Sequence, residues 1–345
     1  MSQFRNLVFE GGGVKGIAYA GALEALEKLQ LNKQPVMPQI KRVAGTSAGA
    51  ITAALVALGA SAKDVAQIVG GTDFRAFLDD SFGIVRDTKR LIQDFGWYKG
   101  DAFANWMKKQ VLVLGGDPNL TFLQLSERAK LDPVRYRELY VVGTGLSMQM
   151  PVVFSAENGA EYPIWYAVRV SMSIPLFFAA VKDTKGYQVL VDGGVTWNYP
   201  LDLFDEVKYL SKPRDKKTFV VPKYPTTYDD NHLYNKETLG FRVDTKDEIR
   251  AEKEAWKLPP KQIDDFFDYL KALVGYMHEM ANKAHLHQND WHRTVFIDAG
   301  GIRTTQFSLS GQQVDMLIQN GRDGVKKYFD WFNDEEADPS PINRV

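Results

Sequence analysis

The chain has no cysteine among its 345 residues, and this absence excludes several kinds of site. A disulfide scaffold, a thiol nucleophile and a zinc centre with thiolate ligands all require cysteine. Opposite charges nearly cancel as well, since 42 basic and 43 acidic residues give a net charge of −1. We therefore expect no nucleic-acid partner, because nucleic-acid grooves need a concentrated basic patch.

Long apolar segments are also scarce. The apolar run Leu7 to Phe9 ends at Glu10, whereas a cleavable signal peptide needs an apolar core of roughly 7–15 residues. Residues 43–62 carry no charge and are about long enough to span a bilayer. Because Gly, Ala, Ser and Thr dominate this stretch, we interpret it as a strand end, a tight turn and a buried helix.

What the sequence does contain is a regular alternation of apolar strands and amphipathic helices. Strands are predicted near 7–9 and 40–44, and each is followed by a helix, at 17–29 and 48–59. This alternation predicts a three-layer α/β fold, with a mostly parallel central sheet and helices on both faces. The pattern continues with strands at 140–142, 152–154 and 295–297, a hairpin over 177–191, and helices at 101–111, 122–129, 164–173, from about 260 to 281, and 311–329.

The segment Gly45-Thr46-Ser47-Ala48-Gly49 has the form G-x-S-x-G, the nucleophile elbow. A serine at a sharp strand-to-helix turn has a strained backbone, so its neighbours at two before and two after must be small, as Gly45 and Gly49 are. The helix that follows directs its N-terminal dipole at the serine and favours developing negative charge. Alone the motif is weak, and a tight turn at a Gly/Ala-rich helix start is the alternative. Its position between an apolar strand and a helix favours a catalytic Ser47.

A glycine-rich loop joins the first predicted strand to the first predicted helix, with glycines at Gly11, Gly12, Gly13 and Gly16. Such a loop exposes several backbone N–H groups in one direction, as an oxyanion hole requires. The loop also satisfies G-x-G-x-x-G, the dinucleotide fingerprint, but that motif expects an acidic residue at the end of the second strand. Here the second strand leads into Ser47 instead, so we favour the oxyanion hole.

A third motif, Asp192-Gly193-Gly194, follows the apolar run 189–191. An aspartate at a strand end before two glycines can project into a cleft without crowding. A tight Asp-Gly turn would be the better interpretation if the motif stood alone. Together with the elbow and the glycine-rich loop, it indicates a catalytic Asp192 supported by Gly193 and Gly194.

These three motifs, in this order, resemble the patatin-like phospholipase family. In that family the glycine-rich loop forms the oxyanion hole, the elbow serine is the nucleophile, and the aspartate of D-G-[AG] completes a dyad without histidine. The resemblance therefore implies these roles for Gly11 to Gly16, Ser47 and Asp192. It covers about residues 5–205, and we expect 206–345 to complete the sheet and helical layer of a single catalytic domain, 1–345. Other segments also match in type and order: 96–101, 121–125, 173–175, Asn198 and Pro200.

The resemblance also implies what the protein acts on. Phospholipids, lysophospholipids or acylglycerols would be hydrolysed through an acyl-enzyme, without a metal or another cofactor. The expected partner is a membrane lipid or micellar substrate, and no protein partner or activator can be named. We expect a soluble protein, cytoplasmic or exported without a cleavable signal peptide, that contacts membranes peripherally during catalysis.

Several alternatives stay open at this stage. A Ser-His-Asp triad is possible in chain order, because all five histidines follow Asp192, but an α/β-hydrolase places more strands before its nucleophile. A nucleotide-binding module and a catalytically silent family member are the others. The aromatic residues between 74 and 98 form either a lid or ordinary core, with core packing favoured, and the same holds for the apolar stripe 263–281. Lys15 pairs with either a lipid phosphate or a nearby carboxylate. The histidines are His232, His278, His285, His287 and His292.

Overall fold

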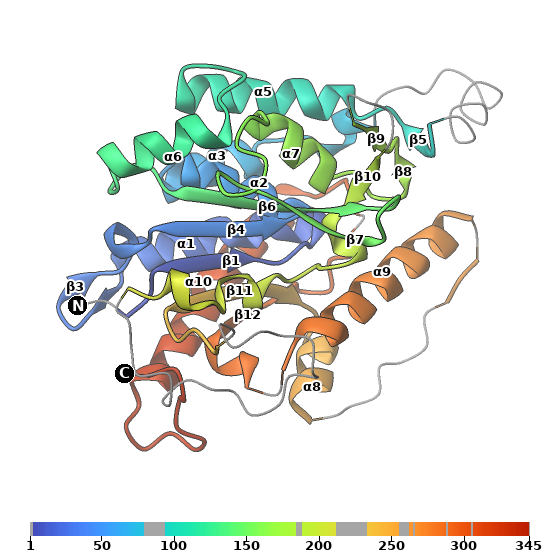
Figure 1. Cartoon of the computed structure of the whole chain (residues 1–345). Coiled ribbons are helices and arrows are strands. Elements are labelled where there is room, and N and C mark those ends of the chain that lie inside the picture. Colours follow the sequence, from blue (N-terminus) through green and yellow to red (C-terminus); the bar gives the residue numbers. More distant parts are fainter. Residues whose placement is uncertain are drawn as a thin grey trace.

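A computed structural model describes residues 3–78, 94–183, 188–211, 233–254, 262–264, 266–287, 289–304 and 306–344. Its centre is an eight-stranded sheet in the order β12-β11-β1-β4-β6-β10-β9, with β7 also paired to β6 (Figure 1). The neighbouring strands from β12 to β6 run parallel, and β7, β9 and β10 are antiparallel to their partners. The strands are β1 (Asn6–Phe9), β4 (Arg42–Thr46), β6 (Glu138–Gly145), β7 (Met150–Phe154), β9 (Val181–Lys182), β10 (Val189–Asp192), β11 (Thr238–Asp244) and β12 (Thr294–Asp298).

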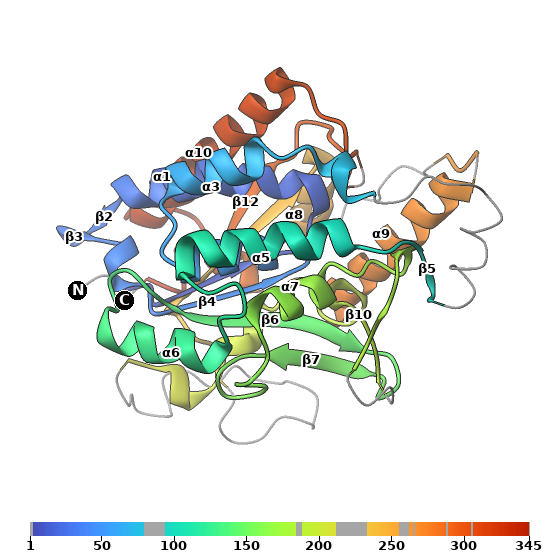
Figure 2. The ribbon, with the colours of Figure 1, turned by 90° about the horizontal axis from the view of Figure 1, so that it is seen from above.

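Helices pack around this sheet, as Figures 1 and 2 show from two directions. Ser61 with Asp64, Thr121 with Gln124 and Ser310 with Gln313 form capping boxes that fix where three of the helices begin. The helices are α1 (Ala18–Lys28), α2 (Ala48–Ala57), α3 (Ala62–Gly70), α5 (Asp101–Gly115), α6 (Phe122–Leu131), α7 (Ile164–Ser171), α8 (Lys246–Glu254), α9 (Phe266–His285) and α10 (Gly311–Asn333). Shorter strands are β2 (Gln30–Leu31), β3 (Gln34–Pro35), β5 (Gly96–Tyr98) and β8 (Leu176–Phe178), and 3₁₀ turns are η1 (Gly13–Ile17), η2 (Met37–Gln39), η3 (Phe74–Phe77), η4 (Gly193–Val195), η5 (Leu201–Phe204), η6 (Val207–Tyr209) and η8 (Asp290–Arg293).

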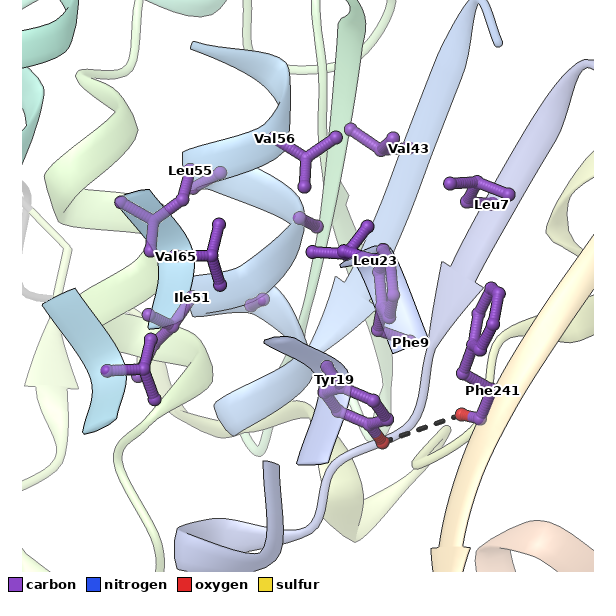
Figure 3. Close-up of a cluster of buried hydrophobic side chains, with 14 of the residues drawn as sticks. Leu7, Phe9, Tyr19, Leu23, Val43, Ile51, Leu55, Val56, Val65 and Phe241 are labelled. Carbon is purple, nitrogen blue, oxygen red and sulfur yellow. Dashed lines mark hydrogen bonds between the residues drawn. The ribbon is translucent and has the colours of Figure 1, made fainter. Parts of the chain in front are cut away.

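The two faces of the sheet bury different sets of side chains, because successive residues of a strand point to opposite faces. On one face, Leu7 and Phe9 of β1 join a large core with helical side chains such as Leu23 and Ile51 (Figure 3). On the other face, Val8 meets a smaller cluster. Residues of η5, η6 and the segment before them cover that smaller cluster: Tyr199, Leu201, Phe204 and Tyr209.

The fold class expected from the sequence is confirmed, and most predicted elements appear within a few residues of their predicted ends. The uncharged stretch 43–62 is a strand end, a tight turn and the fully buried ten-residue α2. In the described part of the chain, no helix is both long and apolar enough to cross a membrane. The predicted helix at 17–29 begins earlier, as the 3₁₀ turn η1 before α1.

One predicted element needs correction, and one strand of the sheet was missed. The predicted hairpin over 177–191 is shorter, because Leu176–Phe178 pairs in parallel with β5 and only β9 with β10 forms antiparallel strands; the predicted turn at 184–186 lies outside the described residues. The strand β11, next to the edge strand β12, was not predicted, because the charged Arg242 and Asp244 interrupt its apolar pattern. These two charges pair with each other inside the protein, at 3.1 Å.

The expected core packing of the aromatic segment 74–98 is partly seen. Phe74 and Phe77 are buried, and Phe77 packs edge-on against Phe103 and Trp106. Phe95 is exposed, and Phe82 lies outside the described residues. In the stripe of α9, the side chains of Leu270, Val274 and Ala281 are buried, whereas Ile263, before the helix, is exposed.

Candidate active site

Ser47 occupies the turn between β4 and α2 with a strained backbone, at φ 53° and ψ −126°. A positive φ is costly for a serine and persists only where the surroundings enforce it. The two glycines of the motif are required by close backbone approach: a Cβ on Gly45 would collide with the Gly49 carbonyl oxygen, and a Cβ on Gly49 would collide with the Phe9 carbonyl oxygen. The local geometry is therefore that of the predicted elbow.

The pairing along β6 brings Asp192 to this elbow. β4 runs parallel to β6 as far as Thr46 opposite Val142. β10 runs antiparallel to β6 and ends with Asp192 opposite Gly143, the next residue of β6. The C-terminal ends of β4 and β10 therefore meet, and a Cβ on Gly193 would come within 3.0 Å of the Thr46 methyl carbon.

Asp192 is fully buried, and within the described part of the chain only one of its carboxylate oxygens has a hydrogen-bond partner. Oδ1 accepts a hydrogen bond from the Gly194 N–H at 2.7 Å. Oδ2 has no hydrogen-bond partner among the residues that the structure describes. Burial raises the pKa of Asp192 to about 7, against the opposing effects of the Gly194 N–H and the Ser47 side chain.

The Ser47 hydroxyl lies beside this carboxyl group, yet its hydrogen bond goes elsewhere. Its influence on the Asp192 pKa makes it a neighbour of the carboxylate. However, Oγ donates to Met172 Sδ at 3.6 Å, and the Ser47 N–H donates to Ser171 Oγ at 2.8 Å. Because sulfur is a weak acceptor, the contact with Met172 holds the Ser47 hydroxyl only weakly.

The glycine-rich loop lies directly against the nucleophile. A Cβ on Gly11 would be 3.1 Å from the Ser47 Cβ, and a Cβ on Gly16 would be 3.1 Å from the Ala48 Cβ. The Gly11 N–H is already engaged, since it donates to the Asn198 carbonyl oxygen at 3.1 Å. Within the described ranges, the N–H groups of Gly12 and Gly13 have no acceptor, so these two backbone donors of the loop are unpaired.

Asn198 holds the loop in place from the segment that follows the D-G-G motif. Besides accepting from the Gly11 N–H, it donates from Nδ2 to the Gly11 carbonyl oxygen and to Glu10 Oε1, both at 3.2 Å. From the sequence, Asn198 was a match to the family in residue type, without a predicted role. The structure places it between the glycine-rich loop and Gly194.

Glu10 was not predicted to belong to the site. It is buried beside the loop, accepts from Asn282 Nδ2 at 2.6 Å, and forms an ion pair with Arg242 at 3.4 Å. Burial raises the pKa of Glu10 to about 7, although the charges of Arg242 and Lys15 oppose this change. The charge of Lys15 therefore acts on this carboxylate, but no ion pair of Lys15 is seen among the described residues, and its pairing stays a prediction.

The histidines do not form a catalytic triad in the described part of the chain, because the Ser47 hydroxyl bonds to no imidazole there. His278 comes nearest to the motif residues: its Nε2 would lie 2.5 Å from a Cβ on Gly194. His285 instead stacks on Trp197. His232 lies outside the described residues.

Comparisons with known proteins agree with this fold. VipD of Legionella pneumophila has a similar structure, with a TM-score of 0.55 at 18% identity, covering 95% of this chain and 67% of VipD. In sequence, YqhO of Bacillus subtilis is 30% identical over 328 residues, which is 91% of this chain and 94% of YqhO. A probable lipid hydrolase, 463L of Invertebrate iridescent virus 6, is 23% identical over 215 residues, covering 62% of this chain and 67% of that protein.

Fold and elbow together are those of a hydrolase built on a mostly parallel sheet. The family described as patatin-like phospholipase matches residues 7–205, and the chain belongs to this family. It is an enzyme, a lipid acyl hydrolase.

Proposed function

We propose that this enzyme hydrolyses carboxylic esters of phospholipids, lysophospholipids or acylglycerols through a Ser47–Asp192 dyad and an acyl-enzyme intermediate. The observation that carries the proposal is the meeting of two strand ends along β6. It puts a strained serine beside a buried carboxylate whose Oδ2 has no hydrogen-bond partner in the described residues. A serine nucleophile without histidine needs another adjacent base, and this carboxylate can supply it.

In the first half-reaction, Asp192 Oδ2 accepts the proton of the Ser47 hydroxyl while Oγ attacks the ester carbonyl carbon. The N–H groups of Gly12 and Gly13 stabilise the negative charge on the carbonyl oxygen. When the tetrahedral intermediate collapses, the ester C–O bond breaks and the alcohol leaves with the proton held by Asp192. In the second half-reaction, water replaces Ser47 Oγ on the acyl carbon, and the carboxylic acid is released.

The raised pKa of Asp192 suits this role. An ordinary aspartate, with a pKa near 3.9, is a feeble base for a hydroxyl group. Burial brings the pKa of Asp192 to about 7, closer to the optimum for proton transfer at neutral pH. An ester substrate also fits, since an alcohol leaving group needs less protonation than an amine.

The exposed face of α9 supports peripheral contact with a lipid surface during catalysis. Tyr269, Tyr276 and Met280 follow the spacing of a single helix face and are 52%, 64% and 45% exposed. Amphipathic aromatic side chains on one face favour the membrane interface. We also propose that 206–345 belong to the same domain as the motifs, because β11 lies between β12 and β1 in one sheet.

Labelling with a fluorophosphonate probe tests the dyad directly. We expect the probe to attach to Ser47 in the wild-type enzyme, and we expect Ser47→Ala to lose both labelling and turnover of a p-nitrophenyl acyl ester. Ser308→Ala, an exposed serine, is the matched control and should label normally. Attachment at another serine, or ester turnover by Ser47→Ala, would contradict the proposal. Ester turnover without added nucleotide separates it from the nucleotide-binding alternative.

A further inference from the structure

Helix α9 brings a histidine into the candidate site from a distant part of the sequence. The helix packs on η4, which begins with the two glycines after Asp192, and it lies at the same end of the molecule as β10 in both ribbon views (Figures 1 and 2). The His278 side chain is only 9% exposed. Its Nε2 atom is buried and has no hydrogen-bond partner among the residues described.

A second buried atom without a hydrogen-bond partner in the described residues, Asn198 Oδ1, also lies near Gly194. Asn198 Oδ1 would be 2.9 Å from a Cβ on Gly194, and His278 Nε2 would be 2.5 Å from it. The orientation of the Asn198 amide is fixed, because its Nδ2 donates to Glu10 and to the Gly11 carbonyl oxygen. Its oxygen therefore lies between Gly11 and Gly194, where it would collide with a Cβ on Gly11 and lie 2.9 Å from a Cβ on Gly194.

The carboxylate of Asp192 borders this place as well. Its Oδ1 atom accepts from the Gly194 N–H, and its Oδ2 atom has no partner in the part of the chain that is described. Asn198 Oδ1 and His278 Nε2 thus both lie against Gly194, whose N–H bonds the carboxyl group of Asp192. Buried polar atoms that converge in this way are typically bridged by a water molecule with two to four partners.

The hydrogen-bonding types of the three groups fit one water. The imidazole is neutral, because burial and the nearby charge of Lys15 lower the pKa of His278 to about 4. With its proton on Nε2, it donates to the water oxygen. The water donates one hydrogen to Asn198 Oδ1 and the other to Asp192 Oδ2, which leaves a lone pair for attack.

We propose that His278 and Asn198 hold the water that hydrolyses the acyl-enzyme, beside the base Asp192. This inference rests on the proposed dyad and assigns positioning residues to its second half-reaction. Asp192 takes one proton from the held water as the water oxygen bonds to the acyl carbon. The bond between that carbon and Ser47 Oγ then breaks, the proton passes from Asp192 to Oγ, and the carboxylic acid leaves.

The experiment measures the two half-reactions separately in the full chain. With a p-nitrophenyl ester, release of nitrophenol reports acylation as a burst, and steady-state turnover reports deacylation. For His278→Leu we expect deacylation about 100-fold slower, since a misplaced reactant costs about that factor. The burst rate should stay within about threefold of the wild-type rate. As a result, kcat and KM should fall together, while kcat/KM stays close to the wild-type value. The acyl group should accumulate on Ser47, as intact-protein mass spectrometry would show.

Two further variants make the test specific. His278→Gln keeps a side-chain donor and should recover part of the deacylation rate, and it also serves if the leucine variant does not fold. His285→Leu, on the same helix, should keep both rates. Unchanged deacylation in His278→Leu and His278→Gln would overturn the inference, and so would equal losses in burst and steady state. Failure of the dyad is a separate result, because fluorophosphonate would then not label Ser47 even in the wild type.

Discussion

Asp192 and Asp205 are both fully buried, but the protein surrounds them in opposite ways. Asp205 is paired at both oxygens by Arg293, at 2.5 and 2.7 Å, and accepts a further bond from the Asn235 N–H at 3.0 Å. Among the described residues, the carboxylate of Asp192 accepts one hydrogen bond of good geometry, from the Gly194 N–H. A buried carboxylate that is fully paired can hold a fold together, whereas one left half-satisfied costs stability. We infer that Asp192 is kept for its chemistry.

Asp205, Arg293 and Asp290 form a buried charged cluster that connects two segments of the chain. Arg293 also bonds Asp290 at 2.7 Å, so one guanidinium joins two carboxylates. Asp205 follows η5, and Arg293 ends η8 just before β12. The cluster therefore connects η5, which covers the smaller hydrophobic cluster, to the start of the edge strand β12.

Replacing the two aspartates by asparagine gives the largest expected contrast. Asp192→Asn removes the base, and we expect turnover to fall by about 10⁴-fold, as for a lost triad member. Its stability should rise, because above pH 7 the wild-type fold bears the cost of an ionised Asp192, about 4 kcal/mol for a pKa moved from 3.8 to about 7. Asp205→Asn should instead be less stable, with turnover per folded molecule preserved.

Urea unfolding at pH 5 and pH 8, with ester turnover on the same samples, measures both effects. The sign is fixed by the raised pKa: between pH 4 and 7 the unfolded chain releases the Asp192 proton and the fold retains it. The stability advantage of Asp192→Asn should therefore grow as pH rises through this window. An Asp192→Asn variant less stable than wild type at pH 8 would contradict the comparison.

The second prediction concerns the paired cluster alone. Arg293→Met leaves two buried carboxylates without a cation, and we expect a loss of about 3–5 kcal/mol in the free energy of unfolding. Arg322→Met is the matched control, because Arg322 pairs with Glu24 at the surface, where a salt bridge contributes about 0–1 kcal/mol. Urea titration measures both. Similar losses of unfolding free energy in the two variants would mean that burial does not increase the contribution of the Asp205–Arg293 ion pair to stability.

The same contrast shows what the sequence could predict. The elbow was predictable, because the strain at Ser47 requires small residues at fixed positions close by in the chain. Strongly periodic strands and helices were predictable for the same local reason. The strand β11 was not, because buried Arg242 and Asp244 compensate each other only after folding.

Long-range polar contacts leave a weaker signal. Nothing near Glu10 in the chain indicates that Asn198 and Asn282 will donate to its carboxylate. For His278 a signal existed: it follows Val274 by four residues and precedes Ala281 by three, and both of these are buried. Helical spacing therefore places this imidazole on the inner face of α9. Which groups it meets there depends on the docking of the helix, which the sequence pattern does not specify.

The smallest predicted effect is the pH dependence of kcat/KM. This rate constant should rise with pH, whereas the contribution of Asp192 to the stability of the fold falls. Asp192 must be ionised to accept the Ser47 proton, so with a pKa of about 7 the rate should rise about tenfold between pH 6 and pH 8. Glu10 has a pKa of about 7 as well, so the profile of Glu10→Gln identifies the titrating group. If the rise persists in Glu10→Gln, it belongs to Asp192; if it disappears, Glu10 controls the site. A midpoint near pH 4 would mean that the Asp192 carboxylate is solvated in the working enzyme. The cost of burying a charge would then not explain how Asp192 differs from the paired Asp205.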